Sequence, residues 1–166
     1  FGGAFYAFVR AEEVDVGCTP DDYRGLIEKG SAIKRAVADS RAIPHPFEED
    51  LSFLYGTIFV GEARGTGAHS RNVCVFADGQ VDRCPTGTGI SARLAIHHAR
   101  GEIDEGEPLV VESILGTRFI GRVAGVTSFG PHKAVIPEIE GSAHIVGRQE
   151  FIIDPSDPLR HRFILR

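Results

Sequence analysis

The stretch from Asp82 to Ala92 constrains the fold of this chain more than any other. It reads Asp-Arg-Cys-Pro-Thr-Gly-Thr-Gly-Ile-Ser-Ala and leads into the helical pattern of residues 93–100. The small residues predict a strand end that turns directly into a helix N-terminus. Unpaired backbone N–H groups and the helix dipole favour an anion at such a terminus. We therefore expect an anion-binding turn, with the rest of the chain as its scaffold.

The glycines of this turn also match the loose G-x-G-x-x-A pattern of dinucleotide-binding folds. Such a fold would continue into a parallel strand that ends in an acid. Here a hairpin pattern precedes the helix and antiparallel-type patterns follow it, so the match is weak. The chain also lacks the Gly-Lys-Ser/Thr of a P-loop.

A narrower interpretation remains for the turn. Gly87 and Thr88 offer backbone N–H groups to a small anion such as a carboxylate, and Asp82 places a negative charge a few residues away. Together they suit a zwitterionic amino acid. The alternative is structural: the glycines only make a tight turn, and Asp82 caps the helix or pairs with Arg83.

Composition limits the classes of partner. The chain has 166 residues, 42% hydrophobic and 25% charged, which is enough for one domain with its own core. Its net charge is −5 and its basic residues are scattered singly, which argues against a nucleic-acid surface. No apolar run approaches the ~20 residues of a membrane span. We expect a small-molecule ligand and no nucleic-acid or membrane partner.

Cysteine and histidine spacing indicates neither a metal site nor a disulfide framework. Cys18, Cys74 and Cys84 lie far apart and form no CxxC pair. His97 and His98 are adjacent, so their rings diverge on a helix and form no HExxH-type site. We expect no metal, no cofactor, and reduced thiols in the cytoplasm.

Apolar patterns predict several strands around two helices, an α+β fold. An N-cap hydroxyl, a proline and two acids at Thr19–Asp22 begin a helix at residues 20–39. An Asp-Gly pair between two alternating segments predicts a hairpin before the anion-binding turn. The strand patterns cover residues 4–9, 51–60, 71–76, 80–82, 109–115, 117–126, 132–139 and 143–153.

Five stretches of the chain together carry a family resemblance. They are Val75-Phe76, Val81-Asp82-Arg83-x-Pro85-x-Gly87-Thr88-Gly89-x-Ser91-Ala92-Arg93, His98-Ala99-Arg100-Gly101, Gly106-Glu107-Pro108, and Glu112-Ser113-Ile114-x-Gly116-x-Arg118-Phe119-x-Gly121. Shorter matches near both ends, at Gly2-Gly3-Ala4-Phe5-Tyr6-Ala7 and Phe151-Ile152-Ile153-Asp154, extend it over nearly the whole chain. In these stretches the chain resembles the proline racemase superfamily, which includes hydroxyproline epimerases and trans-3-hydroxy-L-proline dehydratases.

The resemblance implies a fold and a domain organisation. Members have two similar diaminopimelate-epimerase-like domains, each a curled, mostly antiparallel sheet around a central helix, and they hold substrate between the domains. Residues 1–153 would then be the second domain, and residues 154–166 a tail that can return to a first domain preceding Phe1. The strand-like start and the absence of Met agree with a piece of a longer polypeptide. A homodimer is also compatible with the sequence.

The resemblance also implies a reaction. Racemases of the family carry one reactive cysteine on each domain, the second after Asp-Arg-Ser-Pro, where this chain has Thr86. A hydroxyl cannot replace a thiolate base near neutral pH. The replacement resembles the dehydratase branch, in which a first-domain cysteine removes the α-proton of trans-3-hydroxy-L-proline and the 3-hydroxyl leaves as water, giving pyrroline-2-carboxylate.

By the same resemblance, the site residues take separate roles. The Gly87 and Thr88 amides hold the carboxylate and Asp82 receives the ring ammonium. Thr86 orients the substrate in place of the family cysteine. Phe76 resembles an aromatic wall of the pocket, and Phe5 is a second candidate wall.

Two other functions stay open. Cys84 stands two residues before Thr86, where serine is usual, and residues two apart in an extended segment point to the same side. Cys84 is therefore either a packed small residue or the second base of a proline or hydroxyproline racemase or epimerase. The chain could also be a non-catalytic amino-acid-binding domain, and without a first-domain base we expect these 166 residues alone to have no turnover.

Overall fold

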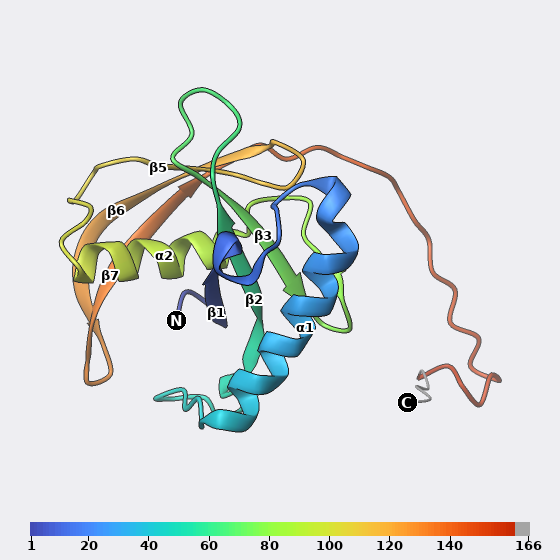
Figure 1. Cartoon of the computed structure of the whole chain (residues 1–166). Helices are drawn as coiled ribbons and strands as arrows, with labels where there is room; N and C mark the ends of the chain where they lie inside the picture. The colour runs from blue at the N-terminus through green and yellow to red at the C-terminus, as the bar shows by residue number, and fades with distance from the viewer. Residues whose placement is uncertain (162–166) are drawn as a thin grey trace.

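The alternating segments of the chain assemble into one curled sheet, as the computed structural model of residues 1–161 shows (Figure 1). Its seven strands follow the order β1-β2-β3-β5-β6-β7, with β4 paired to β3. The β1/β2 and β3/β5 ladders are parallel and the other four are antiparallel. The strands are β1 Phe5–Arg10, β2 Leu54–Gly61, β3 Ser70–Phe76, β4 Gln80–Val81, β5 Leu109–Glu112, β6 Arg118–Phe129 and β7 His132–Glu140. The predicted α+β class and the mostly antiparallel sheet are confirmed.

The helix α2, Gly87–Ala99, is the central helix of this curled sheet. It crosses β6 and β7 and packs against both (Figure 1). Ile90 and Leu94 on α2 are fully buried against Val111 of β5 and Val123 of β6. A side chain at Gly121 of β6 would meet Ile90 at 2.7 Å, so strand and helix approach too closely for anything larger than glycine.

The helix α1, Tyr23–Ser40, lies on the other face of β2 and β3. Successive strand residues point to opposite faces, so Phe59 of β2 faces α1, whereas Ile58 lies next to α2. The helix comes close to the sheet at Gly30, whose carbonyl accepts a 2.9 Å hydrogen bond from the buried Thr57 hydroxyl. The two helices thus lie on opposite faces of the sheet, α1 over β2 and β3 and α2 over β6 and β7, with Ile58 of β2 reaching the start of α2.

The predicted hairpin connects β3 to β4, and its turn includes Gly79 with a φ of +100°. It delivers the chain directly to the N-terminus of α2, as the sequence predicts. The helix predicted at residues 20–39 is also present: a short 3-10 turn, Pro20–Asp22, runs into α1. The Thr19 hydroxyl and backbone N–H both donate to the Asp22 carboxylate at this start.

The strand predicted at residues 143–153 is wrong. This segment has no ladder partner among the described residues and runs away from the sheet (Figure 1). Its apolar side chains are exposed, with Ile145 at 93% and Ile152 at 89%. Alternating β-branched residues show only that a segment suits a pleated surface, while a strand also needs a neighbouring edge to pair with. The proposed boundary after residue 153 stays a prediction, and residues 162–166 of the expected tail lie outside the described residues.

Candidate active site

The turn that the sequence predicts to bind an anion begins where β4 ends. The backbone N–H of Asp82 donates to the Cys74 carbonyl of β3 at 3.1 Å, which ties the turn to the sheet. Thr86 is the N-cap residue of α2 and has φ 68° and ψ 96°. A β-branched residue rarely adopts positive φ, so the surrounding contacts must hold this conformation in place.

The buried Thr86 hydroxyl connects the two ends of the turn by a hydrogen bond. It is 5% exposed and donates a 2.7 Å hydrogen bond to Oδ2 of Asp82. Asp82 thus accepts from the side chain of the N-cap residue, and among the described residues it neither caps α2 nor pairs with Arg83, the two roles that the structural alternative expected. Its second carboxylate oxygen, Oδ1, is not used in this bond. Burial raises the pKa of the neighbouring Cys74 thiol to about 12, and the Asp82 carboxylate adds to the rise. This thiol stays protonated at neutral pH.

The first turn of α2 presents unused donors. Its first backbone bond runs from the Ile90 N–H to the Thr86 carbonyl at 2.9 Å. The N–H groups of Gly87, Thr88 and Gly89 therefore have no acceptor within the helix. A Cβ at Gly89 would lie 2.4 Å from Ile58, so the helix start packs tightly on β2. The arrangement is a rigid set of donors at the positive end of a helix dipole.

A cavity of about 520 Å³ opens beside these donors. Five of the six predicted site residues line it: Asp82, Thr86, Gly87, Thr88 and Phe5. The sixth, Phe76, is not among the lining residues. It stacks on Tyr55, which does line the cavity, with ring centroids 5.5 Å apart.

The sequence predictions missed several aromatic residues of the cavity wall, including Tyr6, Phe53 and Tyr55. The Tyr6 hydroxyl lies 2.7 Å from the Thr88 hydroxyl, and burial raises the pKa of Tyr6 to about 12, so this phenol is neutral. Leu51, Phe53 and Tyr55 follow one another at every second position and all line the cavity. That two-residue period was the signal in the sequence that could have identified this part of the wall.

Cys84 also lines the cavity and is half-buried. It is therefore placed differently from the other two cysteines, Cys18 and Cys74, which are both buried. A thiol of the chain does face the same space as Thr86.

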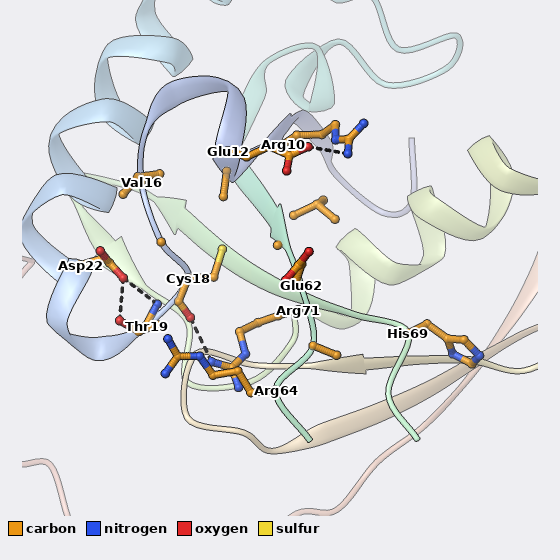
Figure 2. Close-up of a pocket in the computed structure, with 15 residues that line it drawn as sticks. Arg10, Glu12, Val16, Cys18, Thr19, Asp22, Glu62, Arg64, His69 and Arg71 are labelled. Atoms are coloured by element: carbon orange, nitrogen blue, oxygen red, sulfur yellow. Dashed lines mark hydrogen bonds and ion pairs between the residues drawn. The ribbon is translucent and has the colours of Figure 1, made fainter. Parts of the chain in front are cut away.

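A larger cavity, of about 800 Å³, lies at the opposite ends of the parallel strands β1 and β2 (Figure 2). Arginines and acids share its wall, and its buried cation, Arg71, is already paired with Glu112 at 3.0 Å. Burial raises the pKa of the lining Cys18 thiol to about 11, which keeps it protonated. Size alone does not make this cavity the reactive one, because its buried cation already has a counter-charge and its lining thiol stays protonated at neutral pH.

Among residues 1–161, no three His, Cys, Asp or Glu side chains come close enough together to bind a metal ion. None of the helices in that range has the length and apolar character to span a bilayer.

The comparisons with known proteins agree with the geometry. The profile of the Proline racemase family matches residues 1–164. The chain is 43% identical to a trans-3-hydroxy-L-proline dehydratase of Colwellia psychrerythraea over 166 residues, which is all of this chain and 47% of that protein. It is 42% identical to a human protein of the same name, again over all of this chain and 48% of the relative. The chain thus spans about half the length of the curated relatives it matches.

A solved structure is also similar. It is a hydroxyproline epimerase from Agrobacterium vitis with bound trans-4-hydroxy-L-proline. The TM-score is 0.89 at 34% sequence identity, and the match covers 99% of this chain and 47% of that one. The curled sheet and central helix are therefore shared along essentially the whole chain.

Proposed function

The chain belongs to the proline racemase family, and on that basis we propose that it supplies half of a site that dehydrates trans-3-hydroxy-L-proline. The other half, with the base that removes the α-proton, would come from the remainder of a longer polypeptide. Curated relatives named as this dehydratase, about twice as long as the chain, support both parts of the proposal.

The cavity at α2 suits the fixed charges of an amino acid. A carboxylate fits the Gly87 and Thr88 amides, because these donors lie at the positive end of a helix and lack an internal acceptor. The ring ammonium fits Oδ1 of Asp82, since Oδ2 already accepts from Thr86. The pocket is thus matched to a zwitterion at both ends.

The observation that carries the choice of reaction is the hydrogen bond from Thr86 to Asp82. Racemisation needs a base on each face of the α-carbon. The Thr86 proton is donated to a carboxylate, and a hydroxyl has no accessible anionic form at neutral pH. Thr86 therefore orients substrate with its oxygen lone pairs and takes no proton from carbon.

The proposed reaction then uses one base. That base takes the α-proton, the electron pair forms the double bond between the α- and β-carbons, and the 3-hydroxyl leaves with a proton as water. The products are the cyclic enamine form of pyrroline-2-carboxylate and one water, so atoms balance, and the enamine becomes the cyclic imine when its nitrogen loses a proton and the β-carbon gains one. Charge that develops on the carboxylate during proton loss is stabilised by the two amides.

The test is to incubate the full-length protein that carries this chain with trans-3-hydroxy-L-proline and to detect the cyclic imine by mass and by its reaction with an imine-specific reagent. Thr86→Ser should retain the reaction, because it keeps the hydroxyl. Thr86→Cys should lower it and introduce exchange of the α-hydrogen on trans-4-hydroxy-L-proline. No imine at high enzyme concentration would sink the proposal.

A second candidate is an epimerase that uses Cys84, because this thiol lines the same cavity. It predicts loss of α-deuterium with inversion on L-proline or trans-4-hydroxy-L-proline, and Cys84→Ser should abolish both. Retention of full dehydratase activity in Cys84→Ser would leave this cysteine with no part in the main reaction.

The third candidate is a binding domain without catalysis. The 166 residues alone should bind an amino acid weakly and show no turnover, because the base lies elsewhere. Measurable dehydration by this chain alone would contradict the placement of the base outside it.

A further inference from the structure

We propose that Asn72 is a positioning residue for the anion-binding turn, and that Arg93 holds Asn72 in the orientation this requires. The inference rests on the proposed function for its consequence on substrate, while its structural part concerns the turn alone. Neither residue lines the cavity of the candidate active site among the described residues.

Three side chains form a buried polar chain beneath the turn. Asn72 of β3 is 0% exposed, and its Nδ2 donates to the Pro85 carbonyl at 3.1 Å. Its Oδ1 accepts from Nη1 of Arg93 at 2.9 Å. The same Nη1 donates to the Ser70 hydroxyl at 2.7 Å. The residue before Thr86 and the middle of α2 are therefore both tied to one strand.

Arg93 settles which way the Asn72 amide points. A guanidinium only donates, so the Asn72 oxygen must face Arg93 and the NH₂ group must face Pro85. Arg93 is 7% exposed, and burial lowers its pKa to about 10, so it still carries its charge at neutral pH. Its hydrogen-bond partners are the Ser70 hydroxyl, the Asn72 amide oxygen and the His97 ring, and none of them is a carboxylate. The bond to Asn72 is therefore one of the few interactions that compensate for burying the charge of Arg93.

The bond to Pro85 bears directly on the strained residue. Fixing the Pro85 carbonyl fixes the plane of the peptide that joins it to Thr86, and Thr86 has φ 68°. Strained conformations persist only where several contacts determine them. If the Pro85 carbonyl were released, Thr86 could relax toward negative φ, and the Gly87 and Thr88 N–H groups would turn away from the cavity.

Asn72→Asp separates the two roles of this side chain. The carboxylate still accepts from Arg93 and gives it a counter-charge, so the unfolding temperature of the full-length protein should stay close to that of the wild type. The donor to Pro85 is lost and replaced by an acceptor that repels the carbonyl. We expect kcat/KM for trans-3-hydroxy-L-proline to fall about tenfold or more, mainly through kcat, since a net hydrogen bond is worth about tenfold.

Ser70→Ala is the matched control. It removes the bond from Arg93 to the Ser70 hydroxyl and leaves the bond to Pro85 in place, so it should lower the unfolding temperature and leave kcat/KM nearly unchanged. If Asn72→Asp does not fold, Asn72→Ser replaces it, because its short hydroxyl cannot reach both partners. Equal losses of kcat/KM in Asn72→Asp and Ser70→Ala would show a merely structural role and overturn the inference.

A crystal structure of Asn72→Asp keeps this inference separate from the proposed reaction. Loss of the positive φ at Thr86 supports the positioning role even if the wild type dehydrates nothing. A Thr86 that keeps its conformation, with the amides still facing the cavity, overturns the role even if the wild type is an active dehydratase.

Discussion

Two polar clusters of this chain, at opposite ends of β1 and β2, differ in one respect. Around Glu112, beside the larger cavity, the carboxylate accepts from the Arg64 and Gly65 backbone and from the Arg71 and Arg118 side chains. At the start of α2, backbone donors face a cavity and have no acceptor within their helix. The Glu112 carboxylate thus finds its partners within the chain, although the buried Nε of Arg71 has no hydrogen-bond partner among residues 1–161. The backbone donors at the start of α2 find no such partner in their own helix.

This difference suggests that the Glu112 cluster contributes to stability and that the donors at the start of α2 contribute to ligand binding. A buried carboxylate that already accepts from four donors, as Glu112 does, offers a ligand no unpaired charge, however large the cavity beside it. Fixed donors that lack an acceptor gain a hydrogen-bond partner when a ligand binds, and little free energy is lost in reorienting them. The comparison predicts that substitutions in the first cluster change unfolding and that substitutions in the second change affinity.

The largest expected effect is on stability, from a substitution in the Glu112 cluster. Glu112→Gln leaves Arg71 buried without its counter-charge, so the free energy of unfolding should fall by about 3 kcal/mol. Urea denaturation measures this loss. Arg118→Gln is the control, because Arg118 is 42% exposed and its ion pair should contribute less than about 1 kcal/mol. A Glu112→Gln protein that keeps its stability but loses amino-acid binding would break the comparison.

The same cluster should show a defined pH dependence. Backbone N–H donation from Arg64, followed by the Arg71 side chain, lowers the pKa of Glu112 to about 2. A lowered folded-state pKa contributes stability that is complete above the unfolded pKa of about 4.5 and is lost as pH falls toward 2. The stability difference between wild type and Glu112→Gln should therefore shrink across that window. A difference that stayed constant from pH 5 to about pH 2 would contradict this cause of the shift.

The second-largest effect is expected at the start of α2, on the affinity for an amino acid. Asp82→Asn removes the charge proposed to hold the ring ammonium, so affinity for L-proline should fall about 30-fold, as expected for a lost hydrogen bond to a charged group. L-Proline is the probe because it lacks the 3-hydroxyl and cannot be dehydrated. Asp78→Asn, in the hairpin turn, makes the same charge change away from the cavity and should leave affinity unchanged. Equal affinities for L-proline in the two variants would show that Asp82 does not bind the ligand.

The smallest effect concerns the cavity wall. Tyr6→Phe removes the hydroxyl that lies 2.7 Å from the Thr88 hydroxyl, which should weaken L-proline binding by about 1 kcal/mol or less. Tyr23→Phe, on a side chain that is 47% exposed, is the matched control and should have no effect. Isothermal titration of both variants resolves the difference. Stronger binding by Tyr6→Phe would show that this hydroxyl competes with the ligand for the helix start.

The sequence predicted the second cluster far better than the first, for a physical reason. The turn at α2 lies within a few consecutive residues, so its glycines, threonines and acid could be interpreted together. Glu112 takes its partners from 41 and 48 positions away, which no local pattern records. The bond between Asn72 and Pro85 was missed for the same reason, because it joins residues that are not neighbours in the sequence. The strand predicted at 143–153 is wrong because a strand needs a neighbouring sheet edge, which the β-propensity of a segment does not specify.

The most direct test of the central claim is a crystal structure of the full-length protein with L-proline bound. The account predicts the carboxylate within hydrogen-bond distance of the Gly87 and Thr88 N–H groups, and the ring nitrogen beside Oδ1 of Asp82. L-Proline in the cavity beside Arg71, or with its carboxylate turned away from the start of α2, would contradict it.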